Sequence, residues 1–135
     1  MMEQRAYAVE LKIPDNEAYT AMRALQRLGI EVARVQRADL LVFTGDESEE
    51  GLRERIERDE RLFNPNKHRL ERLSEMRPRE GEVWVEMLDA PSSVPMRRLV
   101  SWRLFDRAGE PLGGDELDAA CLRLLCNPAI ERAIR

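Results

Sequence analysis

The sequence predicts an α+β protein built from two related modules. Some segments alternate apolar and polar side chains with the period of a strand, whereas others repeat apolar side chains at helical spacing. In addition, a pattern of acidic turn, helix, Asn-Pro and short strand occurs twice. With 135 residues, of which 43% are hydrophobic, the chain has the size of one ordinary domain or two very small ones.

The first predicted elements are a strand over 5–13 and a helix over 16–28. Asp15 is a good N-cap for the helix, and Gly29 is a suitable stop after it. One face of the strand carries Tyr7, Val9, Leu11 and Ile13. The apolar side of the helix carries Ala18, Met22, Leu25 and Leu28.

Two strand pieces and a second helix continue the first half. The polar residues 36–39 predict a bend or tight turn between the two pieces, the second of which covers 40–43. Residues 47–63 predict a helix with a narrow apolar stripe, and Pro65 stops it because proline disfavours helical conformation in the residue before it. A short strand over 67–73 follows.

The second half begins with a strand over 82–88 and continues, after a proline-containing loop over 90–95, with a strand over 98–105. Asp115 is the predicted cap of the last helix, and residues 129–135 form a closing strand. The apolar face of that helix carries Leu117, Cys121, Leu124 and Leu125.

The end of this last helix carries the most specific pattern in the chain. Residues 124–131 read Leu-Leu-Cys-Asn-Pro-Ala-Ile-Glu. The motif resembles the end of the small PurS subunit of bacterial phosphoribosylformylglycinamidine synthase, where a helix ends Leu-Leu-Ala-Asn-Pro-Val-Ile-Glu and passes into the last strand. The resemblance gives a structural role to the motif residues, which are Asn64, Pro65, Asn127, Pro128, Ile130 and Glu131.

The resemblance implies antiparallel sheets with helices on one face, in two ferredoxin-like modules related by the internal repeat. Residues 1–75 would form a β-α-β-β-α-β module, 76–81 a linker, and 82–135 a shortened β-β-α-β module. The chain departs from the family pattern at 66–67, which lack an aliphatic–acidic pair, and at 90–98, where a loop replaces the first helix.

A sheet covered on one face leaves apolar side chains on the other, and the resemblance implies that modules bury them by pairing through their sheets. Two modules in one chain would achieve this pairing internally, and otherwise the protein would form a homo-oligomer. The alternative is that the strand side chains line the helix–sheet core of their own module. The residues concerned are Tyr7, Val9, Leu11, Val83, Val85, Val100 and Trp102.

Composition argues against several classes of protein. The net charge of −4, with both signs mixed along the chain, is unlike a nucleic-acid-binding surface. No apolar run approaches the roughly 20 residues that cross a bilayer, and the first residues lack the apolar stretch of a signal peptide. Two cysteines are too few for a disulfide scaffold. We therefore expect a cytoplasmic protein without nucleic-acid or membrane partners.

The reactive side chains do not form a catalytic signature. His68 is the only histidine, and Cys121 and Cys126 lack the Cys-x-x-Cys spacing of metal or redox sites. The acidic cluster at 115–118 complements the dipole of its helix. The sequence predicts no catalytic residue, no metal site and no cofactor, so an enzyme is the least expected class.

Three hypotheses remain. By resemblance, the chain is a non-catalytic accessory subunit that bridges glutaminase and synthetase subunits in purine biosynthesis, and a glutamine amidotransferase and a synthetase are its expected partners. The second hypothesis is a small-molecule-binding regulatory module of the ACT or ferredoxin-like type. The third is a self-associating protein of another process.

Overall fold

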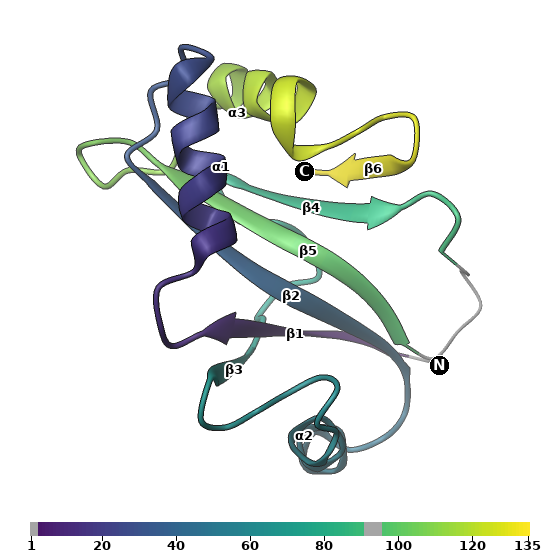
Figure 1. Cartoon of the computed structure of the whole chain (residues 1–135). Helices are drawn as coiled ribbons and strands as arrows, with labels where there is room; N and C mark the ends of the chain where they lie inside the picture. The colour runs from purple at the N-terminus through teal and green to yellow at the C-terminus, as the bar shows by residue number, and fades with distance from the viewer. Residues whose placement is uncertain (1–2, 91–95) are drawn as a thin grey trace.

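The computed structural model describes residues 3–90 and 96–135. Its strands form a single six-stranded antiparallel sheet in the order β3-β1-β2-β5-β4-β6 (Figure 1). The chain is therefore an α+β protein, as the sequence predicts. In chain order the elements are β1 (Glu3–Leu11), α1 (Asn16–Arg27), β2 (Arg34–Gly45), α2 (Glu49–Arg58), β3 (His68–Arg72), β4 (Glu82–Met87), β5 (Met96–Phe105), α3 (Gly114–Ala120), the π-helical turn η1 (Cys121–Leu125) and β6 (Glu131–Ile134).

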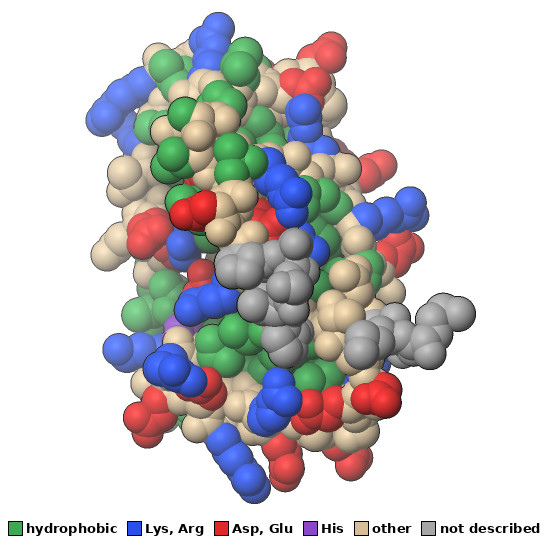
Figure 2. All heavy atoms as spheres, turned by 90° about the vertical axis from the view of Figure 1, so that its right-hand side faces the viewer, with side chains coloured by type: hydrophobic (Ala, Val, Ile, Leu, Met, Phe, Trp, Pro, Cys, Tyr) green, Lys and Arg blue, Asp and Glu red, His purple; other side chains and the backbone are tan. Residues whose placement is uncertain are grey.

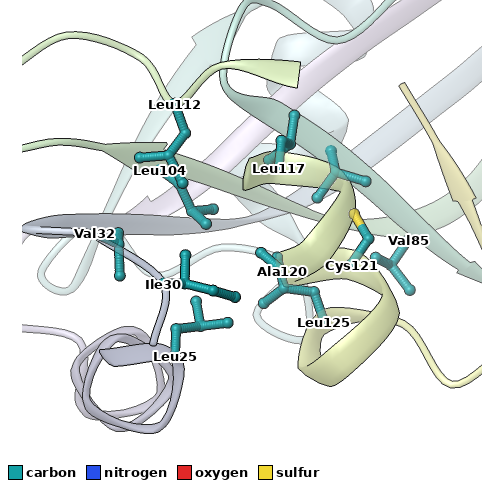
Figure 3. Close-up of a cluster of buried hydrophobic side chains, with 11 residues drawn as sticks. Leu25, Ile30, Val32, Val85, Leu104, Leu112, Leu117, Ala120, Cys121 and Leu125 are labelled. Atoms are coloured by element: carbon teal, nitrogen blue, oxygen red, sulfur yellow. The ribbon is translucent and has the colours of Figure 1, made fainter. Parts of the chain in front are cut away.

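The helices of the described residues lie on one face of the sheet. Helix α2 buries Leu52 and Ile56 against β1 and β2. Helix α1 lies over β2 beside the α3–η1 segment, and their shared core packs on β4 and β5 (Figure 1). Figure 3 shows the core between them, where Leu25, Leu104 and Leu125 point toward one another. Side chains alternate along strands, so every second side chain points to the opposite face, and no helix within residues 3–90 and 96–135 lies over that face.

The seven strand side chains considered for module pairing belong to the helix-covered face. Tyr7 and Val9 pack against α2, whereas Val83 and Val85 pack under α1 and α3 with Trp102. Leu11 and Val100 share this face by strand alternation. The structure thus supports the second interpretation, in which these residues line helix–sheet cores. The two halves join edge to edge through β2 and β5, not face to face.

The helix-free face is not open, contrary to the expectation from the resemblance. Strands β3 and β4 are separated in the sheet by three other strands, so the segment 73–81 that connects them must cross the sheet. It crosses the helix-free face, where Leu73 packs with Ala6, Leu40 and Trp84. These side chains are buried without a second copy of the sheet.

The strand order reads the same from either edge when each strand of the first half is matched with one of the second. The pairs are β1 with β4, β2 with β5, and β3 with β6. Ala8 pairs with Leu40 in the first half, as Trp84 pairs with Ser101 in the second. When the two halves are aligned on Asn64 and Asn127, these registers match about the pair of Asp39 and Val100 in the contact between β2 and β5. Helix α1 follows β1, but no helix of the described residues follows β4.

One predicted turn is absent. The bend expected at 36–39 is wrong, because β2 continues through these residues and pairs with β5 along its length. The polar side chains do not need a turn to reach favourable partners. The Arg37 guanidinium lies 3.2 Å from Glu17 and stacks over the ring of Trp102. The first half is therefore β-α-β-α-β within the described residues.

The helix boundaries agree with the predicted caps and stops at some ends and differ at others. Asp15 caps α1 as predicted, since its carboxylate accepts the N–H groups of the second and third helical residues. Helix α2 ends at Arg58, earlier than predicted, because the Asp59 carbonyl accepts two later N–H groups and forms a turn. Gly113, not Asp115, is the N-cap of α3. The loop predicted at 90–95 lies, apart from Ala90, outside the described residues.

Candidate functional site

The two Asn-Pro turns have the same hydrogen bonds. In the first, the Asn64 N–H donates to Nδ1 of His68 over 2.9 Å; in the second, the Asn127 N–H donates to Oε1 of Glu131 over 2.8 Å. Each asparagine side chain also accepts the N–H of the residue two positions later. Each asparagine carbonyl accepts two more N–H groups further on. His68 and Glu131 thus have equivalent structural roles, and each turn leads the chain into an edge strand, the second directly from η1 and the first from the turn that follows α2.

The remaining motif residues belong to the same turns. Pro65 and Pro128 follow the asparagines and are exposed. The carbonyl of Ile130 accepts the N–H of Leu88 over 2.8 Å, which extends the pairing of β4 with β6. The equivalent bond of the first half joins the carbonyl of Lys67 to the N–H of Lys12, also over 2.8 Å. These contacts are structural, and none of them assembles reactive groups.

The two cysteines differ in environment. Cys121 is buried in the core under α3, and burial raises the pKa of its thiol to about 11, with a smaller contribution from Cys126. Cys126 is half-buried, and burial also raises the pKa of its thiol. Raised pKa values keep both groups as thiols near neutral pH, which is the state of low nucleophilicity.

The helix-free face contains two buried carboxylates on one strand, β4. Glu82 is 1% exposed, and its carboxylate accepts the Arg79 backbone N–H over 2.8 Å, the Arg79 Nε over 3.0 Å and the Ser101 hydroxyl. Burial raises the pKa of Glu82, but the hydrogen bonds from Arg79 and Ser101 together outweigh it and lower the net pKa. Glu82 is therefore ionised inside the protein.

Glu86 forms the second buried cluster. Arg97 donates two hydrogen bonds to its carboxylate, over 2.8 and 2.7 Å, and Nε of Arg132 donates a third over 3.0 Å. The hydrogen bonds from Arg97 are the largest cause of the lowered pKa of Glu86, burial opposes them, and Arg132 lowers the pKa further. The arrangement is a satisfied bidentate ion pair, which fixes β5 and β6 to β4.

Beside Glu82 lies a polar cavity of about 210 Å³ on the helix-free face. Ala8 and Ala38 contribute small side chains to its lining. Charged and polar side chains from both halves and from the crossing segment complete it: Glu10, Gln36, Glu71, Arg79, Ser101 and Arg103. Arg37 also borders it. The cavity exists only where the two halves meet.

A second, apolar groove lies between α1 and η1 on the other face. Its volume is about 400 Å³, and Trp102 of β5 lies between walls formed by Ala21 and Ala24 of α1 and by Leu124 of η1. The π-helical turn is closed by the Cys126 N–H, which donates to the carbonyl of Cys121. Such turns occur frequently at functional sites. Leu124, predicted to be buried, is 41% exposed because it borders this groove.

Sequence reasoning missed the two buried acids. Glu82 and Glu86 alternate with valines, and this pattern predicts that they face solvent. One signal could have found them: Trp84 lies between them on the same strand face, and a tryptophan on a polar face indicates that the face is covered.

Comparisons with known proteins identify no relative: neither a family model nor a curated protein matches the chain. In the described part of the chain, no helix has the length and apolar character needed to cross a bilayer. Nor do residues 3–90 and 96–135 bring together three His, Cys, Asp or Glu side chains in a way suited to a metal ion. The described surface has several cavities, and among them the polar one beside Glu82 and the apolar groove over Trp102 are suited to recognition.

Proposed function

We propose that this chain is a non-catalytic accessory protein of the cytoplasm, built as two PurS-like modules fused in one polypeptide. In this role it bridges a glutamine amidotransferase subunit and a synthetase subunit in purine biosynthesis. The observation that carries the proposal is the repeated Asn-Pro turn, whose hydrogen bonds recur at equivalent ends of a sheet with palindromic strand order. The fusion replaces pairing between subunits with the pairing of β2 and β5.

One exposed corner of the second half is a candidate for partner contact. Met87, Leu88 and Ile130 are 45–53% exposed at the end of β4 and the start of β6. The equivalent corner of the first half has Lys12 and Lys67 in place of Leu88 and Ile130. Figure 2 faces the end of the sheet that includes the apolar corner and shows hydrophobic surface interrupted by charged side chains. The two corners share the same backbone hydrogen bond, but one exposes apolar side chains and the other exposes lysines. This difference favours a role in partner binding for the apolar corner.

The proposal is tested by copurification and genetics. A tagged chain is expected to capture the glutamine amidotransferase and synthetase subunits from its own cells, and a deletion strain is expected to require purines. A double variant, Leu88→Lys with Ile130→Lys, gives the second corner the charges of the first and is expected to lose the partners. Lys67→Ala, at the equivalent corner, is the matched control and should keep them. A deletion strain that grows without added purines would refute the proposal.

The apolar groove over Trp102 favours a second candidate, the small-molecule-binding regulatory module. The groove has the size of many ligand sites and presents an aromatic ring between small side chains. A thermal-shift screen of amino acids and nucleotides tests this candidate, and Ala24→Phe, which fills the groove, should abolish any shift that originates there. The homo-oligomer expected from the sequence stays a prediction, which light scattering on the purified chain can check.

A further inference from the structure

The approximate twofold relation between the halves provides an internal comparison for the polar cavity. The position equivalent to Ala8 in the second half is Trp84. Ala8 pairs with Glu71 and Trp84 with Ile134, and these two partners lie at the same distance along the chain from the equivalent asparagines of the Asn-Pro turns. Trp84 is buried and fills the helix-free face of its half. The alanine leaves that volume empty in the first half. The cavity is therefore specific to the first half, although the architecture is shared.

The halves also differ in how many arginine partners hold the equivalent glutamates. Glu10 and Glu86 are equivalent, since Arg69 pairs with the first and Arg132 with the second in the sheet register. Glu86 is held by two arginines, one of which is Arg97. The residue equivalent to Arg97 is Gln36, four positions before Leu40 as Arg97 is before Ser101.

Glu10 thus lacks the arginine that neutralises its counterpart. Among the described residues, no ion pair or side-chain hydrogen bond holds the carboxylate of Glu10, although it borders the cavity. Glu71 lies on the same side, from β3, and its carboxylate is 3.4 Å from Nη1 of Arg79. On this wall Glu10 is therefore the carboxylate that forms no ion pair among the described residues, whereas Glu71 is paired with Arg79.

The other wall has a cation that forms no ion pair among the described residues, although its guanidinium lies over the ring of Phe105. Arg103 lines the cavity from β5, and its Nε is buried without a hydrogen-bond partner among the described residues. Burial lowers the pKa of the Arg103 guanidinium, and repulsion from Arg79 lowers it further, while the nearby glutamates oppose these effects. Arg79 is already occupied by Glu82. Arg103 is thus the guanidinium that remains available for an external carboxylate.

From this geometry we infer that the polar cavity binds a free α-amino acid, with the ligand carboxylate on Arg103 and the ligand ammonium on Glu10 and Glu71. The ligand needs both of its charges. A zwitterion complements a guanidinium on one wall and a carboxylate on the other, whereas an ion with a single charge is repelled by one of the two walls. The volume of about 210 Å³ lies below the range of roughly 300–1,000 Å³ that holds drug-sized ligands, so it suits a molecule with few heavy atoms.

The inference goes beyond the accessory role and does not depend on it. Partner capture depends on the exterior, whereas the amino acid would occupy a cavity between β1, β2 and β5 under the crossing segment. Copurification can therefore fail while amino-acid binding succeeds, and the reverse also holds. The groove over Trp102 lies on the opposite face, so its variants distinguish the two cavities.

The experiment is calorimetric titration of the purified full chain with each of the common α-amino acids. For every amino acid that binds, the matching α-hydroxy acid removes the ammonium and the matching primary amine removes the carboxylate. We expect saturable 1:1 binding of at least one amino acid, and affinities about tenfold or more weaker for both analogues, because each loses a charged hydrogen bond. If no amino acid binds, or if either analogue binds as tightly, the inference is wrong.

Three variants and a control locate the binding. Arg103→Gln removes the cation, and Gln36→Arg gives Glu10 the arginine that its counterpart has; each should weaken binding about tenfold or more. Ala8→Trp should abolish binding by filling the cavity as the second half does. Arg132→Gln changes the equivalent cluster of the second half and should leave binding unchanged. Should Ala8→Trp fail to fold, Gln36→Arg still decides, since unchanged binding in that variant excludes the cavity.

Discussion

The substitution Glu82→Gln tests the buried charge on the helix-free face most directly. It keeps the shape of the side chain and removes the negative charge that accepts hydrogen bonds from Arg79 and Ser101. Removing one partner of a fully buried ion pair costs about 3–5 kcal/mol. The Arg79 side chain is 40% exposed, so it regains water when the charge is lost, and the expected cost is smaller.

We expect Glu82→Gln to lower the free energy of unfolding by about 2 kcal/mol, the scale of hydrogen bonds to a charged group. For a chain of this size, that loss lowers the melting temperature by roughly 6 °C. Urea unfolding followed by circular dichroism gives the free energy, and calorimetry gives the temperature. Glu80→Gln is the matched control, because that neighbouring side chain is exposed; it should change stability by less than about 0.5 kcal/mol.

The pH dependence of the difference identifies its electrostatic origin. The pKa of Glu82 is lowered in the folded protein relative to its ordinary value of 4.5. Its charge therefore stabilises the fold above that value, and the contribution is lost as the pH falls through the lower folded pKa. The two proteins should differ by a constant amount between neutral pH and about pH 5 and converge in more acidic solution. A difference that persists unchanged in strong acid, or that is below about 0.5 kcal/mol at neutral pH, would refute the reasoning.

Three further outcomes follow from the packing. Gly81→Ala should cost about 2 kcal/mol or more in urea unfolding, because Gly81 has φ +73° and an added Cβ would lie 2.8 Å from the carbonyl oxygen of Leu104. Gly114→Ala, in open space at the first residue of α3, is the control and should cost less than about 0.5 kcal/mol. Leu104→Ala should lower the free energy of unfolding by about 3 kcal/mol, since it opens a hole in a fully buried position. At mildly alkaline pH, mass spectrometry should find that a thiol reagent modifies Cys126 in the folded chain and reaches Cys121 only in urea, and equal labelling of both in the folded chain would contradict the assigned burial.

Local chemistry in the sequence determined a large part of this structure. The Asp15 cap lies where it was predicted because it depends on N–H groups two and three residues away. The Asn-Pro turns and the alternating strands are equally local, since their signals depend on close neighbours in the chain. The prediction of a turn at 36–39 failed because polarity indicates a turn only in the absence of long-range partners, and Arg37 finds such partners in Glu17 and Trp102.

The candidate cavity could not be predicted by such reasoning. Its walls come from four strands and the crossing segment, and most of the residues involved are ordinary polar or charged side chains when read in order. Glu10 has the same alternating context as its counterpart Glu86, and only the sheet register shows that one has an arginine partner and the other does not.

By itself, the sequence determined the class of fold, most of its elements and the repeated turn, because these depend on interactions over a few residues. Only the tertiary structure decided that the halves join through β2 and β5, that segment 73–81 covers the second face, and that Glu82 and Glu86 are buried as ions. The physical reason is that strand pairing and burial are set by contacts between distant parts of the chain, which no local pattern encodes.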